Sequence, residues 1–247
     1  MTKNDMGSDP IVFKDVEKQY GGLRPLRIRD LRISRGRPTM LIGFDRPTAE
    51  VFVNLITGAS LPEIGEVVCL GRATQEIANS DQWLAFVEQF GIVSDRIVLL
   101  ETMTVAQNLA ISFDLELDPV PPPVLARVKA LASEVGITDS MLETRVADAA
   151  PLLKSRVYLA RAIALDPSVL VLEHPSARLD PEDAKEFAGV VKRVCERRTL
   201  TTVGLLMDEK FANATGGRLL IWQPASGEMR PTPRFGLQRG WPFISRR

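Results

Sequence analysis

A short strand with apolar side chains on both faces constrains the fold more than any other feature of the chain. Residues 168–173 read Ser-Val-Leu-Val-Leu-Glu, and helix-like patterns precede them over 156–164 and follow them over 181–197. A strand that is apolar on both faces must be covered on both faces, which is typical of the centre of a parallel sheet. The order helix–strand–helix therefore favours an α/β protein with helices on both sides of the sheet.

The same alternation extends along most of the chain. Apolar and polar residues alternate over 11–33, and a buried strand at 39–43 is followed by a helical pattern over 49–57. Further strands are predicted at 66–70, 91–93 and 201–206, further helices at 80–90, 104–113 and 124–135, and a hairpin between 217 and 228. The proline-rich hinge at 118–123 suggests a helical insertion between two halves of a mostly parallel sheet.

These patterns divide the chain into three parts. Residues 1–10 are predicted to be a disordered lead, residues 11–228 one domain with a helical subdomain at about 94–165, and residues 229–247 a basic tail. The tail carries five arginines and no acidic residue, with Phe235, Trp241 and Phe243 between them. Packing or disorder of the tail is the favoured interpretation, and contact with an anionic membrane surface is the alternative.

Composition excludes several classes of protein. The 31 basic and 31 acidic residues balance, which argues against a protein that wraps duplex nucleic acid. Two distant cysteines and one histidine argue against a metal site and against a disulfide framework, and they fit a reducing cytoplasm. The chain has no run of 18 apolar residues and no signal-peptide pattern at its start, so we expect any membrane contact to pass through another chain.

Several linked segments occur in an order typical of one family. The longest, residues 157–180, reads Val-Tyr-Leu-Ala-Arg-Ala-Ile-Ala-Leu-Asp-Pro-Ser-Val-Leu-Val-Leu-Glu-His-Pro-Ser-Ala-Arg-Leu-Asp. Shorter ones are residues 54–58, 65–66, 104–105 and 108–110. Together they resemble the ATP-binding-cassette (ABC) transporter ATPase over roughly residues 11–222. The resemblance implies a P-loop NTPase-like nucleotide-binding domain, with a mostly parallel sheet, an N-terminal antiparallel β part and a helical insertion.

By this resemblance the phosphate-binding loop falls on residues 43–50, Gly-Phe-Asp-Arg-Pro-Thr-Ala-Glu. Such a loop needs glycine amides for the phosphates, a lysine for the β- and γ-phosphates, and a hydroxyl for magnesium. Gly43 is retained, but Thr48 takes the place of the second glycine, Ala49 of the lysine and Glu50 of the hydroxyl residue. The substitutions argue against binding of ATP and Mg²⁺, the cofactors that the resemblance implies.

The remaining residues of the loop fit a helix start better than a phosphate site. Asp45 is a candidate helix cap and Pro47 suits a first helical turn. Asp45 and Glu50 add negative charge where a helix N-terminus would otherwise receive phosphate. Arg46 offers the one route to residual anion affinity.

The other family positions are altered as well. The signature Leu-Ser-Gly-Gly-Gln aligns with residues 149–153, Ala-Ala-Pro-Leu-Leu. The remaining remnant positions are Glu173 for the Walker B aspartate, His174 for the catalytic glutamate, Asp95 for the Q-loop glutamine, Met207 for the switch histidine and Tyr20 for the adenine-stacking aromatic. His174 is interpreted as a satisfied histidine at a strand end, and Tyr20 either stacks a base or is an ordinary exposed tyrosine. No catalytic residue and no metal ligand are expected.

The resemblance implies an ATP-binding-type subunit, peripheral on the cytoplasmic face of the membrane. It would dock on a permease through residues 90–113 and 124–135 and form a dimer with itself or with an active ATPase. The segment 108–113, Asn-Leu-Ala-Ile-Ser-Phe, is followed by a proline-rich stretch and a long helix and is similar to the Mla/Mce lipid-transport branch. One alternative is a divergent ATPase that uses Arg46, Glu50 and His174, and another is a soluble regulator outside transport.

Overall fold

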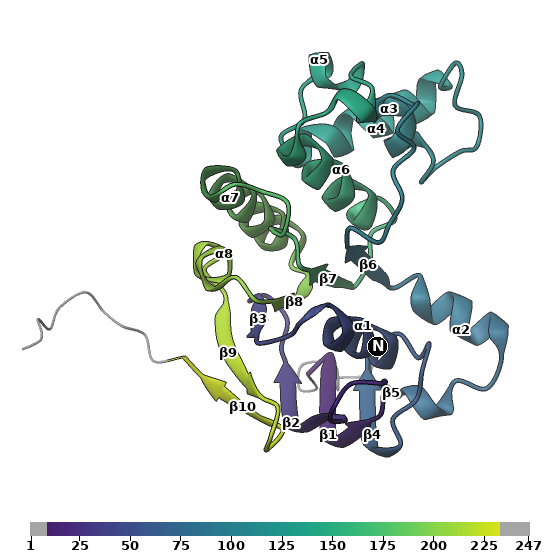
Figure 1. Ribbon diagram of the computed structural model, residues 1–247. Helices are drawn as coiled ribbons and strands as arrows, with labels where there is room; N and C mark the ends of the chain where they lie inside the picture. Colours follow the sequence, from purple (N-terminus) through teal and green to yellow (C-terminus); the bar gives the residue numbers. More distant parts are fainter. Residues whose placement is uncertain (1–8, 233–247) are drawn as a thin grey trace, which may run out of the picture.

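The computed structural model describes residues 9–232, which form two sheets flanked by helices (Figure 1). The first sheet has the strand order β2-β1-β4-β5, with every neighbouring pair antiparallel. Its strands are β1 (Ile11–Lys18), β2 (Leu26–Ile33), β4 (Ile64–Cys69) and β5 (Arg72–Ala73). This sheet is the antiparallel part that the sequence predicts at the N-terminus.

The second sheet has the order β10-β9-β3-β8-β7-β6 and is parallel except for β10. Its strands are β3 (Thr39–Ile42), β6 (Phe90–Val93), β7 (Val169–Glu173), β8 (Thr201–Leu206), β9 (Arg218–Gln223) and β10 (Glu228–Pro231). Every residue of β7 is buried, as its two apolar faces predict, and β7 lies between β6 and β8. The α/β fold with a mostly parallel sheet is confirmed.

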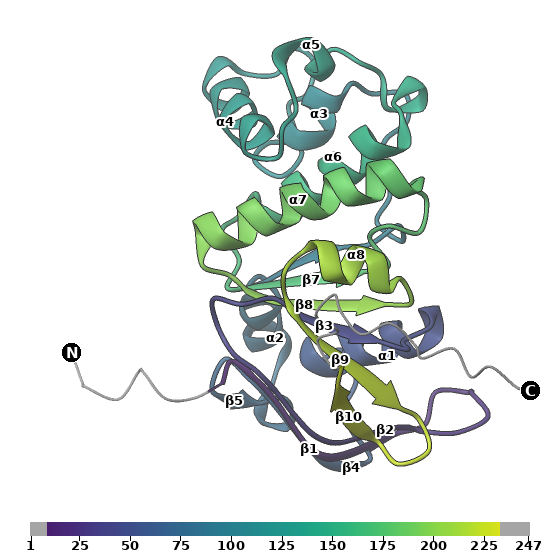
Figure 2. The ribbon, with the colours of Figure 1, turned by 90° about the vertical axis from the view of Figure 1, so that its left-hand side faces the viewer.

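Eight α-helices cover the sheets in the described part of the chain. They are α1 (Arg46–Ile56), α2 (Ser80–Val87), α3 (Val105–Ala110), α4 (Pro122–Glu134), α5 (Asp139–Leu142), α6 (Pro151–Ile163), α7 (Pro181–Arg198) and α8 (Glu209–Ala214), with 3-10 turns at Thr74–Glu76 and Val146–Asp148. Helices α3 to α6 gather at the end of the molecule far from the antiparallel sheet (Figures 1 and 2). One core cluster joins these helices to α7 and to one face of the second sheet, and the other lies between the two sheets around α1.

Several predicted boundaries were wrong. Helix α6 begins at Pro151 instead of residue 156, because proline lacks an N–H and is accepted in a first helical turn. The apolar pattern over 49–57 misses the first three residues of α1, but the helix begins at Arg46, directly after the predicted cap Asp45 and with Pro47 in its first turn. Helix α2 stops at Val87 because β6 begins at Phe90.

Residues at both ends of the described part form hydrogen bonds or strands within the fold. The carbonyl of Pro10 accepts a hydrogen bond of 2.7 Å from the amide of Leu70, and β10 runs on to Pro231. Most of the predicted lead and tail, residues 1–8 and 233–247, lies outside the described residues, and the division of the chain into its three parts stays a prediction. Between residues 9 and 232, no helix is both long and apolar enough to cross a membrane.

Candidate functional site

Four loops meet at one edge of the second sheet. Strands β3, β8, β7 and β6 are parallel neighbours and end at Ile42, Leu206, Glu173 and Val93. Parallel strands place their carboxyl ends at the same edge, where ligands bind in open α/β sheets. The fold therefore brings the loop at 43–45, Asp95, His174 and Met207 to one side of the molecule.

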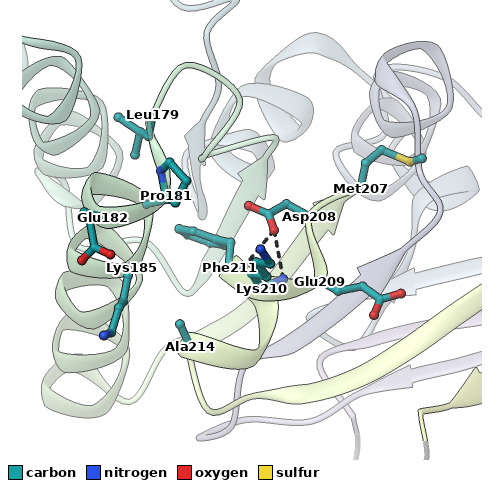
Figure 3. A pocket seen from close by; sticks show the side chains of 11 residues that line it. Leu179, Pro181, Glu182, Lys185, Met207, Asp208, Glu209, Lys210, Phe211 and Ala214 are labelled. Carbon is teal, nitrogen blue, oxygen red and sulfur yellow. Dashed lines mark hydrogen bonds between the residues drawn. The ribbon is translucent and has the colours of Figure 1, made fainter.

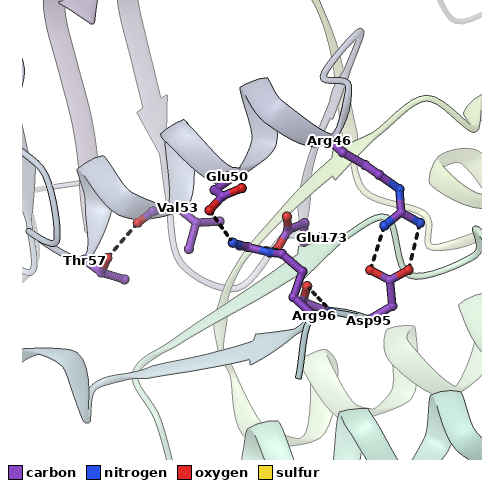
Figure 4. A network of polar contacts seen from close by, with 8 residues as sticks. Arg46, Glu50, Val53, Thr57, Asp95, Arg96 and Glu173 are labelled. Atoms are coloured by element: carbon purple, nitrogen blue, oxygen red, sulfur yellow. Dashed lines mark hydrogen bonds and ion pairs between the residues drawn. The ribbon is translucent and has the colours of Figure 1, made fainter. Parts of the chain in front are cut away.

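Arg46 and Asp95 form a bidentate ion pair across this edge (Figure 4). The two Nη atoms of Arg46 lie 2.9 and 2.7 Å from the carboxylate oxygens of Asp95, and Nε of Arg178 lies 3.4 Å from the same carboxylate. The hydrogen bond from Arg46 is the largest cause that lowers the pKa of Asp95. Arg46, the residue that could have attracted an anion, is therefore already paired with a carboxylate of the protein.

Arg96 joins two further acids of the site (Figure 4). Its Nη1 lies 3.0 Å from Oε1 of Glu50, while its Nη2 and Nε lie 2.7 and 3.1 Å from Oε2 of Glu173. The Glu173 side chain is only 4% exposed, whereas Arg96 is 40% exposed. A buried carboxylate needs a partner, and Arg96 supplies it from the loop after β6. We call Arg46, Glu50, Asp95, Arg96 and Glu173 the ion-pair network.

The amides of Gly43, Thr48 and Ala49 are also occupied. Asp45 accepts a hydrogen bond of 2.9 Å from the amide of Thr48 with its side chain, and one of 2.8 Å from the amide of Ala49 with its carbonyl. Pro47 has no N–H, and the amide of Gly43 donates to the carbonyl of Leu206 at 3.0 Å. The cap predicted for Asp45 is confirmed. Ala49 itself is fully buried.

Comparisons with known proteins bear on the fold and on the family that the sequence resembles. No family model matches the chain. The sulfate/thiosulfate import ATP-binding protein of Thermosynechococcus vestitus is 28% identical over 224 residues, which cover 90% of this chain and 64% of that protein. The methionine import ATP-binding protein of Clostridium acetobutylicum is 28% identical over 194 residues, 78% of this chain and 59% of that one. The chain thus spans about 60% of the length of these relatives.

Solved structures share the fold. A dimeric ABC transporter cassette, MJ0796, superposes with a TM-score of 0.71 at 19% identity, covering 89% of this chain and 96% of that one. Part of an ABC transporter complex from Clostridium perfringens, cbiO1, superposes with a TM-score of 0.75 at 18% identity, covering 90% and 87%. The chain is similar in sequence to ABC ATP-binding subunits and shares the fold of ABC cassettes. Its place in the lipid-transport branch stays a prediction.

Two of the remnant positions differ from their sequence interpretations. Tyr20 is half-buried, not exposed, and its hydroxyl lies 3.2 Å from that of Thr48, so it reaches the loop itself. His174 was predicted to be satisfied, which is wrong: its Nε2 is buried without a hydrogen-bond partner among the described residues. The backbone of His174 is also left-handed, with φ of 46°.

The remaining positions are Met207 and the stretch 149–153. Met207 follows β8 and leaves 61% of its surface exposed. Of the stretch 149–153, aligned with the signature, residues 151–153 form the start of α6, and Ala150 at its N-cap makes no side-chain hydrogen bond there. Neither position adds a charged group to the ion-pair network.

Sequence reasoning missed Arg96 and Arg178. Arg96 lies outside the segments that carry the resemblance, and Arg178 lies within residues 157–180, but the resemblance gives neither of them a role. The available signal is Glu173, an acid that ends a wholly apolar strand and therefore requires a cation nearby. Only the placement of β6 beside β7 identifies that cation, because Arg96 is 77 residues away in the sequence.

The Arg46–Asp95 pair gives a prediction for pH. Replacing Arg46 with methionine should reduce the unfolding free energy by no more than about 1 kcal/mol, because Arg46 is largely exposed. Since the folded-state pKa of Asp95 is lowered, its contribution is present above the unfolded pKa of about 4 and is lost as pH falls through the lower folded value. Urea unfolding at pH 7 and pH 3 should give a smaller difference between the two proteins at pH 3. An equal difference at both pH values would contradict this account.

Proposed function

We propose that this chain is an ABC-type subunit that no longer hydrolyses ATP and acts as a structural partner of a permease or of an active ATPase. The observation that carries the proposal is the ion-pair network: every charged remnant position of the nucleotide site is bound to another side chain of the same protein. The resemblance of the sequence motifs assigns these positions, and the relatives supply the transporter context.

Electrostatics supports the loss of phosphate binding. A triphosphate needs free amides and a cation, whereas here the Thr48 amide is capped and the lysine position is the buried Ala49. Glu50 also lies where the hydroxyl for magnesium is expected, and it is held by Arg96. Two like charges at about 4 Å in a partly buried site repel by about 4 kcal/mol, enough to offset the attraction of one arginine. The residues present therefore do not fit Mg²⁺–ATP.

Direct nucleotide binding tests the proposal. A fluorescent ATP analogue with Mg²⁺ should show no saturable binding to the purified protein at concentrations up to about 1 mM. Phosphate release should stay at the background level, and Glu173→Gln should not change it. Turnover that Glu173→Gln abolishes would instead establish the divergent ATPase.

The loop after β6 supports a docking role. The carbonyl of Val98 accepts a hydrogen bond from Arg161 at 2.9 Å, and the buried Asn108 side chain bonds both the amide and the carbonyl of Leu100. With the backbone fixed in this way, the Val98 side chain is 73% exposed and that of Leu100 is 37% exposed. A rigid loop that presents apolar side chains suits an apolar partner helix. We assign the permease contact to this loop.

Helix α4 contributes less to this surface than its sequence pattern suggests. Its apolar side chains Val124, Val128 and Leu131 are buried in the cluster formed with α3 and α6. Because these side chains are buried inside the chain, they do not contact a partner. The proposed permease contact is therefore limited to the residues before α3.

Co-purification tests the docking surface. An affinity-tagged chain expressed in its own cells should recover an integral membrane protein from detergent-solubilised membranes. The double variant Val98→Glu/Leu100→Glu should lose that protein, because two carboxylates would have to be buried at the contact. Leu84→Glu, which changes a 52% exposed side chain on α2, is the matched control and should retain it. Equal recovery with both variants would place the contact elsewhere.

A further inference from the structure

An open pocket of about 480 Å³, which we call the α2 pocket, is formed by α2, the turn after β4 and the residues before β6 and β7. Its apolar lining comes from Leu70, Ala85 and Phe86, and Phe86 belongs to the core cluster around α1. Gln89 and Ser168 line it directly before the first residues of β6 and β7. Because β6 and β7 are parallel, the α2 pocket lies at the edge of the second sheet opposite to the ion-pair network.

The charged residues of the α2 pocket are all cations. Arg35 and Arg72 line it, and no acid of the described part of the chain does. Neither arginine forms an ion pair with another residue between 9 and 232. The groove between α7 and α8 differs, because two lysines line it together with three acidic residues (Figure 3). Charge therefore selects an anionic occupant for the α2 pocket, whereas it selects no occupant for the groove.

The guanidinium of Arg72 is held in place by neutral acceptors. Its Nη2 donates to the carbonyl of Glu76 at 2.7 Å and to Oε1 of Gln82. The same Oε1 accepts a hydrogen bond of 3.3 Å from the amide of Ala78, so Gln82 is itself oriented. Neutral acceptors fix the position of the guanidinium but leave its charge uncompensated. A guanidinium of this kind matches the paired oxygens of a phosphate or carboxylate.

We propose that the α2 pocket binds a small phosphate monoester with an apolar body. The phosphate lies on Arg72 and Arg35, and the body lies on Leu70, Ala85 and Phe86. A phosphate monoester carries a charge of about −1.5 to −2 at pH 7, which balances two arginines better than a single carboxylate does. The volume is also in the range of pockets that bind small molecules. The proposal does not depend on the loss of ATP hydrolysis.

Isothermal titration calorimetry of the full chain with phenyl phosphate tests the site. Phenyl phosphate should bind saturably, with a Kd below about 1 mM. Inorganic phosphate lacks the apolar body and phenol lacks the charge, so each should bind at least about ten-fold more weakly.

Gln89→Glu is the sharpest variant, because it adds a carboxylate to the α2 pocket with almost no change of shape. Oε1 of Gln89 accepts a hydrogen bond of 2.8 Å from Oγ of Ser168, which a carboxylate oxygen also accepts. The affinity for phenyl phosphate should fall at least about ten-fold, and Arg72→Gln should have a similar effect. Gln19→Glu makes the same change at an exposed residue beyond the other end of β1 and should leave the affinity unchanged.

Three outcomes would overturn the proposal. The absence of saturable binding up to about 10 mM phenyl phosphate would show that the two arginines form no site. Equal affinity in Gln89→Glu, Arg72→Gln and the unaltered protein would place the ligand elsewhere. Binding of phenol as tight as that of phenyl phosphate would show an apolar surface without anion recognition. Arg46→Met, at the opposite edge of the sheet, should not change the affinity, which separates this test from that of nucleotide binding.

Vesicles distinguish two sources of the same chemistry, since phosphatidic acid presents a phosphate monoester on a lipid. Sedimentation of the protein with phosphatidic acid vesicles that Gln89→Glu abolishes would show a lipid headgroup as the source. Binding of phenyl phosphate without such sedimentation would show a soluble molecule.

Discussion

Replacing Arg96 with methionine is expected to lower the free energy of unfolding by about 2 kcal/mol, because it leaves a buried carboxylate without its partner. That carboxylate is Glu173, 4% exposed at the end of β7, and the described residues give it no cation at ion-pair distance other than Arg96. The estimate is below the full range for buried pairs because Arg96 itself is 40% exposed, so water screens part of the interaction. Urea unfolding followed by circular dichroism at pH 7 measures the effect.

Two further variants separate the buried charge from lost packing. Arg96→Met/Glu173→Leu removes both charges and should recover most of the stability, since an apolar pair often replaces a buried ion pair without loss. Arg178→Met removes an arginine that is 69% exposed and should cost less than about 1 kcal/mol. A double variant as unstable as Arg96→Met would show that the loss arises from packing and not from the unpaired carboxylate.

The fold could be predicted from the sequence where hydrophobic patterns and caps are local. Strand β8 has the predicted bounds, and α7 starts at the predicted Pro181 behind its cap Asp180. Such features depend on neighbours within about one helical turn or on alternation along a strand. The helix predicted from residue 156 lacks the first turn of α6, which begins at Pro151, a residue that a first helical turn accepts.

The candidate site could be predicted only in part, because its partners are distant in the sequence. The Asp45 cap is three residues from the amide that it binds, and the sequence indicates it directly. The pairs of Arg46 with Asp95 and of Arg96 with Glu173 span 49 and 77 residues and depend on the order of strands in the sheet. The sequence therefore identifies which acids replace the family residues, but not which arginines neutralise them.

Because β6 packs closely against α6 at Gly91, Gly91→Ala should be one of the most destabilising small substitutions in the chain. A Cβ at Gly91 would lie 2.0 Å from the carbonyl oxygen of Ala162 and 2.9 Å from Cγ of Pro167. The first neighbour is backbone within α6, so neither side chain rotation nor a local shift relieves the contact. We expect a loss of about 3 kcal/mol in the free energy of unfolding, at the upper end for overpacked cores.

Gly189→Ala is the matched control, because it adds the same methyl group with the opposite expected sign. Gly189 lies inside α7, and its Cβ would meet only the end of the Arg193 side chain at 3.7 Å. Alanine in a helix interior should stabilise the protein by about 0.5–1 kcal/mol. Thermal unfolding of both variants decides the matter: if Gly91→Ala is as stable as Gly189→Ala, then β6 and α6 are free to move apart. In that case the loop carrying Asp95 and Arg96 would not be held in place by the packing behind it, and the ion-pair network alone would have to fix its position.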